Sequence, residues 1–140
     1  QAVVTTTSRG NVEALLGRQL GPGWARRFDT MVCGEDVSAK KPAPDAHRLA
    51  LAAMRLPAAQ ALAIEDSRAG ATAARAAGVP VLVTRSVYFP DDPIDDAVAV
   101  GPGLHSRRGW RPAPGPGPAG SIGLADLVDW HARMERVLGT

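Results

Sequence analysis

The sequence predicts an α/β fold in which helices alternate with the strands of a mostly parallel sheet. Over residues 1–101, short apolar runs typical of strands alternate with segments of helical periodicity. The run at 79–84 is apolar almost throughout, as in strands that are buried on both faces of a sheet. Strands that are joined by helices lie parallel, with right-handed crossovers. A length of 140 residues and a hydrophobic content of 45% suit one domain with a substantial core.

The first four elements are predicted from their local patterns. Ala2–Thr5 is a short apolar strand that ends in hydroxyl side chains. A helix is expected over 11–20, where apolar residues recur at helical spacing until a glycine and a proline end it. A strand follows at 30–34. The next helix covers 45–54, with Asp45 as its expected N-cap.

The following elements continue the alternation. A strand is predicted at 61–64, and an alanine-rich helix at 68–77, which the glycine after it ends. The strand at 79–84 comes next, and a short fifth strand is expected at 96–100. Residues 1–101 are therefore interpreted as one α/β unit.

The remainder of the chain has a different composition. Residues 102–123 are rich in proline and glycine and have no periodicity, which is typical of a linker or loop. Residues 124–140 form the C-terminal part, with a helix predicted over 124–138. This helix has an apolar stripe that includes a histidine, for which we expect a packing or capping role rather than a catalytic one: Leu124, Leu127, Val128, His131, Met134, Val137 and Leu138.

Composition narrows the class of protein. The net charge is only +2 and the arginines are scattered, so we expect no nucleic-acid partner. No apolar stretch approaches the ~18 residues of a membrane span, so we expect no membrane partner. Cys33 is the only cysteine and lies in an apolar run, which favours a buried core residue over a nucleophile. A chain that cannot form an internal disulfide fits the reducing cytoplasm. The oligomeric state is not indicated.

Polar side chains follow the predicted strands. The carboxyl ends of parallel strands meet at one edge of the sheet, where ligands bind. Thr5, Thr6 and Thr7 end the first strand, and hydroxyls next to the N–H groups of a helix start can hold phosphate oxygens. Lys41 lies after the second strand, where a compact positive charge can hold a carboxylate and a phosphate. Taken singly, the threonines could also cap a helix, and the lysine could be solvated.

Glu65 and Asp66 are adjacent carboxylates at the end of the third strand. Both can stay ionised if a cation lies beside them, and Mg²⁺ prefers oxygen ligands and phosphate. The pair could instead cap the following helix, because acidic side chains are favoured at helix N-termini. The order of the threonines, the lysine and the acidic pair along successive strands favours a site for phosphate and a divalent metal ion.

Three motifs, in order, resemble those of the haloacid dehalogenase (HAD) superfamily of hydrolases. The stretch VVTTTSRGNVEALL resembles the second motif, with Thr5 in the Ser/Thr position. CGEDVSAKKPAPDAHRLAL resembles the third, with Lys41, directly before Pro42, in the position of the catalytic lysine. LAIEDSRAGATAARAAGVPVLVT resembles the fourth, with Glu65 and Asp66 as the acidic pair. The residues of these motifs are similar to those of the family branch that contains CbbY-type phosphatases, β-phosphoglucomutase and phosphoglycolate phosphatases.

This resemblance implies a Rossmann-like three-layer α/β/α fold and Mg²⁺-dependent chemistry on a small phosphorylated sugar or acid. In the family, an aspartate attacks phosphorus to form an aspartyl-phosphate, and a second aspartate acts as general acid and base. Lys41 and Thr5 would be catalytic, Thr5, Thr6, Thr7 and Lys41 would bind phosphate, and Glu65 and Asp66 would bind the metal ion.

The first motif of the family, DxDGT after an apolar strand, is absent from this sequence, and so is the helical cap that follows it. The first residue is Gln1, so we expect the chain to begin after the cap and to hold an incomplete core without the nucleophile. Alone, it is expected to be inactive. The alternatives are a phosphosugar mutase of the β-phosphoglucomutase kind, and a non-catalytic domain that binds a phosphorylated ligand or a partner protein.

Overall fold

Two parallel β-sheets form the centre of the computed structural model, which describes residues 1–88, 94 and 96–138. The first sheet has two strands and the second has three, and every pairing within them is parallel. The α/β class and the parallel strands are therefore as predicted, although the expected single sheet is divided. The strands are β1 (Ala2–Val4), β2 (Thr30–Val32), β3 (Ala63–Glu65), β4 (Val81–Thr84) and β5 (Ala99–Gly101).

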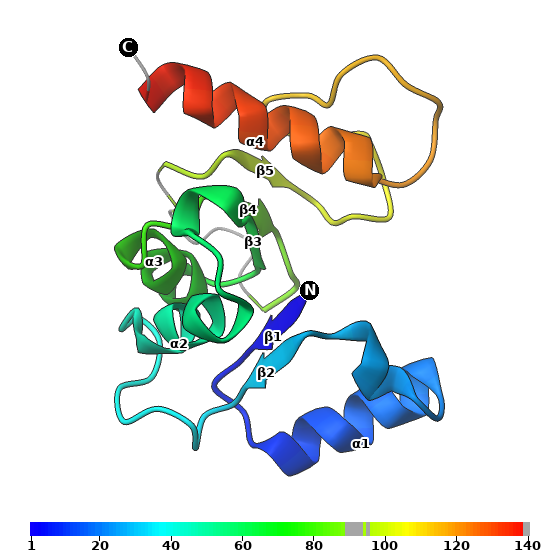
Figure 1. The fold of residues 1–140 in the computed structure, drawn as a ribbon. Coiled ribbons are helices and arrows are strands. Elements are labelled where there is room, and N and C mark those ends of the chain that lie inside the picture. The colour runs from blue at the N-terminus through cyan, green and yellow to red at the C-terminus, as the bar shows by residue number, and fades with distance from the viewer. Residues whose placement is uncertain (89–93, 95, 139–140) are drawn as a thin grey trace.

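Helices surround the strands. Figure 1 shows α2 and α3 together on one side of the strands, α1 beyond β2 at one end, and α4 beyond β5 at the other. Among the described residues, no helix is both long enough and apolar enough to cross a membrane. The helices are α1 (Arg9–Leu20), α2 (Asp45–Met54), α3 (Arg68–Ala76) and α4 (Leu124–Leu138), with short 3₁₀ helices η1 (Trp24–Arg27) and η2 (Ala58–Gln60).

Local capping decides where the first helices begin. Helix α1 starts at Arg9, before the predicted residue 11, because the Ser8 side chain accepts a hydrogen bond from the backbone of Asn11. The prediction that Asp45 is the N-cap of α2 was wrong. Pro44 holds that position and Asp45 is the first helical residue, where its negative charge still favours the helix N-terminus.

Strand boundaries differ more than helix boundaries. The third strand covers Ala63–Glu65, where 61–64 was predicted, and the fifth covers Ala99–Gly101, where 96–100 was predicted. Short apolar runs mark a strand but not its ends, because the pairing with a neighbour sets them. The register aligns Glu65 with Val83 and Gly101 with Thr84, so the three strands of this sheet end together.

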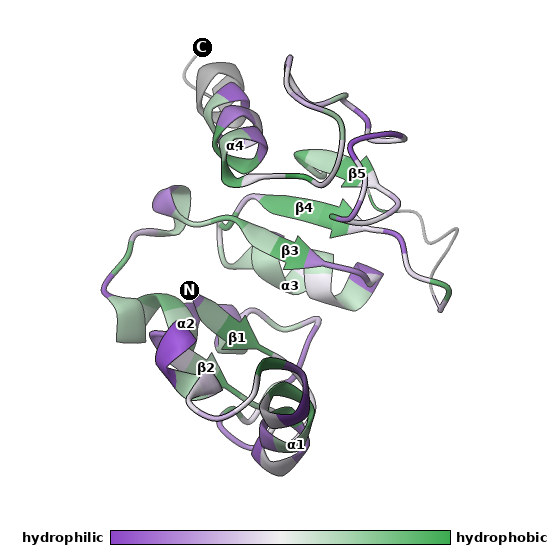
Figure 2. Ribbon diagram, turned by 90° about the vertical axis from the view of Figure 1, so that its right-hand side faces the viewer, coloured by the Kyte–Doolittle hydropathy of each residue, from purple (hydrophilic) through white to green (hydrophobic). Residues whose placement is uncertain are grey.

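The core lies on the larger sheet. Val81, Leu82 and Val83 of β4 are fully buried, as expected for a strand that is covered on both faces. Figure 2 shows β4 and β5 as apolar strands, in contrast to the hydrophilic loops around them. Cys33 is also fully buried, as predicted, and burial raises the pKa of its thiol. This cysteine is therefore a core residue.

Helix α4 packs on this sheet through Leu127 of the predicted stripe and through Trp130, which lies outside it. Trp130 is fully buried and lies against Trp110, with their ring centroids 4.9 Å apart. Two residues of the predicted stripe, Leu124 and Val128, are 76% and 59% exposed. The side chains of Met134, Val137 and Leu138 lie outside the described residues.

The segment from 102 to 123 is attached to the core, where Trp110 is buried and Arg111 exchanges two backbone hydrogen bonds with Val100 of β5. The indole N–H of Trp110 donates to the backbone oxygen of Ser106 at 2.8 Å. Arg107 forms an ion pair with Asp126 of α4 and also donates to the backbone oxygen of Gly115 at 2.6 Å. This loop is thus fastened to α4. The division of the chain into 1–101, 102–123 and 124–140 stays a prediction.

Candidate active site at the strand ends

Lys41 connects the carboxyl ends of β1 and β3. Its Nζ atom lies 2.9 Å from the backbone oxygen of Val4, at the end of β1, and 2.5 Å from Oε1 of Glu65, at the end of β3. Thr5 and Asp66 follow directly on these strand ends. The Lys41 side chain is only 9% exposed, whereas Lys40 is exposed. The structure therefore brings together the positions that the sequence selected from three separate motifs.

Glu65 has a second partner, which the sequence did not reveal. Nε2 of His47, in the first turn of α2, lies 3.3 Å from the same oxygen, Oε1, that accepts from Lys41. The other carboxylate oxygen of Glu65 faces α3, since a Cβ atom at Gly70 would lie 1.9 Å from Oε2. The absence of a side chain at Gly70 makes room for this carboxylate. Glu65 is thus held between a lysine, a histidine and a glycine.

The electrostatics of Glu65 follow from these neighbours. Burial by itself raises the pKa of this carboxyl, because it disfavours the charged form. The hydrogen bond from His47 and the positive charge of Lys41 outweigh burial, so the pKa of Glu65 lies below its ordinary value. The carboxylate is ionised at neutral pH, and the ion pair with Lys41 reduces its repulsion with Asp66.

His47 could have been found from the sequence. It lies three residues before Ala50 on α2, so helical periodicity puts the two on the same buried face. A histidine among buried alanines requires a polar partner. The sequence could not identify that partner, because Glu65 is 18 positions further along the chain and meets His47 only through packing of α2 beside β3.

The threonines form a hydrogen-bonded turn between β1 and α1. The hydroxyl of Thr5 accepts from the backbone N–H of Thr7 at 3.2 Å, and the hydroxyl of Thr7 accepts from the amide of Asn11 at 3.1 Å. Acceptance of a hydrogen bond leaves each hydroxyl its own proton to donate. Thr6 is exposed at the turn. This turn offers hydroxyl donors beside the end of β1.

The N-terminus of α1 already has an acidic partner. The backbone N–H of Arg9 donates to Oε1 of Glu35 at 2.8 Å, and the Arg9 guanidinium pairs with Asp36 at 2.7 Å. Free N–H groups at this helix start were part of the reason for expecting phosphate there. Because Glu35 accepts from the first of them, this N–H group is already paired within the chain.

Asp66 and Glu65 supply the oxygen atoms that a magnesium site requires. Asp66 is exposed, and its carboxylate follows β3 directly. Within the described part of the chain, no three His, Cys, Asp or Glu side chains gather into a metal site. Mg²⁺ is commonly bound through one or two carboxylates and completed by phosphate and water. The donor set therefore fits part of a magnesium site.

Comparison with known proteins agrees with this geometry. The family model for haloacid dehalogenase-like hydrolases matches residues 1–84, which is more than half of the chain. Protein CbbY of Cupriavidus necator is 40% identical over 131 residues, covering 93% of this chain and 52% of the relative. Protein CbbY of Rhodobacter capsulatus is 45% identical over 91 residues, covering 65% of this chain and 40% of the relative.

Solved crystal structures of CbbY are also similar to this chain. The crystal structure of CbbY from Rhodobacter sphaeroides in complex with phosphate is similar, with a TM-score of 0.67 and 41% identity. The match covers 69% of this chain and 43% of that one. A variant of the same protein, in complex with xylulose-(1,5)bisphosphate, matches equally well. The chain spans about half or less of the length of these relatives. It belongs to the haloacid dehalogenase-like hydrolases.

Proposed function

We propose that the protein containing this chain is a Mg²⁺-dependent phosphatase for small phosphorylated sugars or acids. The observation that carries the proposal is Lys41, which is nearly buried and joins the ends of β1 and β3. A lysine held there places one positive charge between the threonine turn and the acidic pair. That position suits a phosphoryl group whose oxygens become more negative during transfer.

Each residue has a separate role in this proposal. The hydroxyls of Thr5 and Thr7 donate to phosphate oxygens, with the exposed Thr6 beside them. Lys41 has three ammonium protons, of which Val4 and Glu65 accept two, and the third is directed to the phosphate. Glu65 orients Lys41 through the 2.5 Å contact. Asp66 and Glu65 would hold Mg²⁺, which supplies charge neutralisation for the phosphoryl group.

The nucleophile is proposed to lie outside residues 1–140. Family chemistry requires an aspartate that attacks phosphorus, and the corresponding motif is absent from this sequence. The substrate class is supported by CbbY from Rhodobacter sphaeroides, which has been crystallised with phosphate and with xylulose-(1,5)bisphosphate. The proposed substrates are therefore sugar phosphates of this size and charge.

The test uses a longer protein that contains this chain. Phosphate release from xylulose-1,5-bisphosphate and from sugar monophosphates is measured with Mg²⁺ and with excess chelator. We expect turnover that requires Mg²⁺ and a raised Mg²⁺ requirement for Asp66→Asn. Asp129→Asn is the matched control, because Asp129 is an acidic residue of α4 that pairs with Arg133. Turnover in chelator, or equal Mg²⁺ dependence of both variants, would contradict the role of Asp66. Isomerised product without phosphate release would indicate a mutase.

A further inference from the structure

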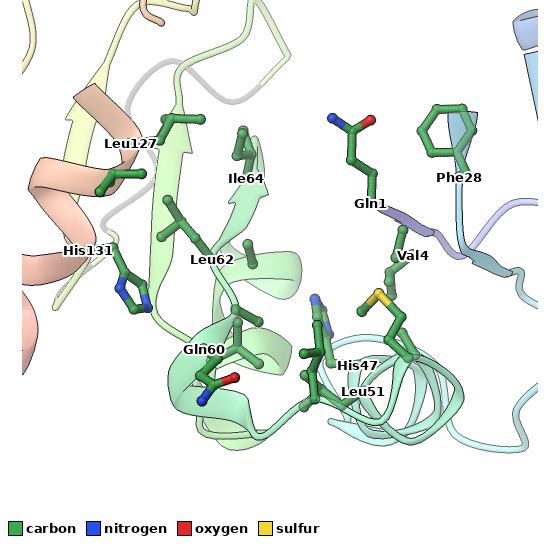
Figure 3. A pocket seen from close by; sticks show the side chains of 18 of the residues that line it. Gln1, Val4, Phe28, His47, Leu51, Gln60, Leu62, Ile64, Leu127 and His131 are labelled. Atoms are coloured by element: carbon green, nitrogen blue, oxygen red, sulfur yellow. The ribbon is translucent and has the colours of Figure 1, made fainter. Parts of the chain in front are cut away.

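His47 is a buried polar residue to which the proposed function gives no role. It lies in the first turn of α2, and its side chain is only 6% exposed. Figure 3 shows its ring standing up from α2 beside the groove that lies between the two sheets, with Val4 on one side and Leu62 on the other. Burial of a polar side chain lowers stability unless the side chain has a partner. The contacts of His47 therefore indicate why a histidine occupies this position.

The two ring nitrogens of His47 have different surroundings. Nε2 lies 3.3 Å from Oε1 of Glu65. Because a carboxylate oxygen only accepts, Nε2 carries the proton in the hydrogen bond between them. Nδ1 is buried and has no hydrogen-bond partner among the described residues. A proton on Nδ1 would be a buried donor without an acceptor, so the tautomer with its proton on Nε2 fits this structure.

Helix α2 fixes the direction of the His47 ring. Ala46 and Ala50 of the same helix are buried and pack in one cluster with Val32 of β2. A functional group on a packed helix is held more precisely than one on a loop. The N–H bond of an imidazole also lies in the plane of a flat, rigid ring. His47 is thus a donor whose direction is set by the fold and which is aimed at Glu65.

Lys41 alone would not fix the Glu65 carboxylate. The last torsion of a glutamate side chain has broad preferences, so its carboxylate turns easily. The ammonium of a lysine is a point charge with rotatable protons on a flexible stem, and it can follow a carboxylate into many orientations. Since Nζ of Lys41 and Nε2 of His47 approach the same oxygen, the rigid histidine determines where that oxygen lies.

We propose that His47 is a positioning residue, whose Nε2–H holds Oε1 of Glu65 in place so that Glu65 holds the Lys41 ammonium toward the phosphoryl group. His47 acts through Glu65 and contacts no reacting atom. The effect on turnover rests on the proposed function, whereas the placement of Lys41 can be measured without it. Loss of a side chain that orients a charged group of a site typically costs about 10–100-fold in activity.

Substitutions of His47 separate its hydrogen bond from its packing. His47→Gln keeps an N–H donor near the position of Nε2, whereas His47→Met has a similar length and helix propensity but no donor. His47→Phe keeps a flat ring without a donor and remains informative if His47→Met does not fold. His131→Met is the matched control, because His131 of α4 lines the same groove and its buried Nε2 has no partner in the described part of the chain.

The first measurement follows the Lys41 ammonium by NMR in a longer protein that contains this chain and is labelled with ¹⁵N-lysine. An ammonium group held in a buried ion pair exchanges slowly with water and gives a sharp signal, which Lys41→Ala identifies by its disappearance. We expect this signal in the parent protein, in His47→Gln and in His131→Met. It should be lost in His47→Met and His47→Phe. Its retention in both variants without a donor would overturn the inference.

The second measurement is steady-state phosphate release from xylulose-1,5-bisphosphate with Mg²⁺. The kcat of His47→Met should fall by about tenfold or more with little change in KM, because Lys41 keeps its charge and loses only its placement in the transition state. His47→Gln should recover most of this loss. Equal kcat values for these two variants would indicate a packing role and overturn the inference, as would an equal loss in His131→Met. A parent protein that releases no phosphate, but shows the expected Lys41 signals, would contradict the proposed phosphatase and still support the positioning of Lys41.

Discussion

Glu65 and Asp66 are adjacent carboxylates that would repel each other if both were ionised in the same surroundings. The sequence suggested that a metal ion relieves the repulsion between Glu65 and Asp66. In the structure, Glu65 forms an ion pair with Lys41 and has Nε2 of His47 beside the same oxygen, and Asp66 is left exposed. The two acids therefore have different surroundings. Asp66 is the more accessible ligand for a metal ion, and Glu65 is the residue that holds the lysine.

Lys41 and Lys40 provide a direct test of this arrangement in a longer protein that contains the chain. Lys41→Ala should lower turnover by about 10²-fold or more, because it removes a charge directed at the transferring group. Lys40→Ala should have little effect, since exposed charges contribute little. Steady-state hydrolysis of a sugar phosphate is the measurement, with folding checked by circular dichroism. If Lys40→Ala is the inactive variant, the assignment of Lys41 is wrong.

The close approach of Gly70 to the Glu65 carboxylate leads to a second prediction. Gly70→Ala places a Cβ atom 1.9 Å from Oε2 of Glu65, a carboxylate that two basic side chains hold in place. We expect a loss of about 1–3 kcal/mol in the free energy of unfolding, as for other overpacked sites. Chemical denaturation of the 140-residue chain measures it.

Gly10→Ala is the matched control. Gly10 also lies near the start of a helix, but no atom is within 4 Å of the added Cβ. This substitution should stabilise the chain by about 0.5–1 kcal/mol, because alanine is the better helix former. Stabilisation by both substitutions would show that the Glu65 side chain moves aside freely.

At the scale of elements, the start of α4 depends on Asp126. Its carboxylate accepts from the backbone N–H of Gly123 at 3.0 Å and pairs with Arg107 of the preceding loop. A side chain in the first turn that reaches back to the cap residue satisfies an N–H group which the helix leaves unpaired. One carboxylate therefore caps the helix and fastens the loop that precedes it.

Asp126 should make stability depend on pH. The hydrogen bond from Gly123 holds the pKa of this carboxyl below its ordinary value of 3.8, against the opposing effect of burial and with the help of Arg107. A lowered pKa in the folded state gives stability that is present above pH 3.8 and is lost as pH falls through the folded value.

Asp126→Asn is the corresponding variant. It should cost about 1.5–3 kcal/mol at pH 7, as for other hydrogen bonds to charged groups, and the difference from the parent chain should shrink below about pH 4. Denaturation at a series of pH values measures this difference. Asp129→Asn is the control, because Asp129 is half-exposed and its ion pair lies on the helix surface. A difference that does not change with pH would refute the charge-based explanation.

The isolated 140-residue chain is expected to be catalytically inactive. The described strand ends collect hydroxyls, a lysine and two carboxylates, and the nucleophile is proposed to lie elsewhere. We therefore predict that the isolated 140-residue chain releases phosphate from sugar phosphates only at the background rate. A phosphate-release assay with Mg²⁺ measures this. Turnover by the isolated chain that Lys41→Ala abolishes would place the nucleophile within residues 1–140.

The α/β class, the order of the elements and the positions at the strand ends were predictable from the amino-acid sequence. These follow from local signals: apolar runs for strands, periodicity and caps for helices, and motifs whose spacing places Thr5, Lys41 and Glu65 after successive strands. Such signals depend on neighbours within one or two turns of the chain. For that reason the existence and type of each main element were predictable, while strand ends were not.

The contacts of these residues could not be predicted, because they form only when distant parts of the chain pack together. His47 contacts Glu65, and Trp110 contacts Trp130, because elements that are distant in the sequence pack together. No local pattern encodes such contacts. The same applies to the stripe of α4, where periodicity identified an apolar face but could not show that Leu124 and Val128 remain exposed. Burial depends on which surfaces are present to cover a face. Here two parallel sheets leave a groove between them, and that division is a property of the folded chain alone.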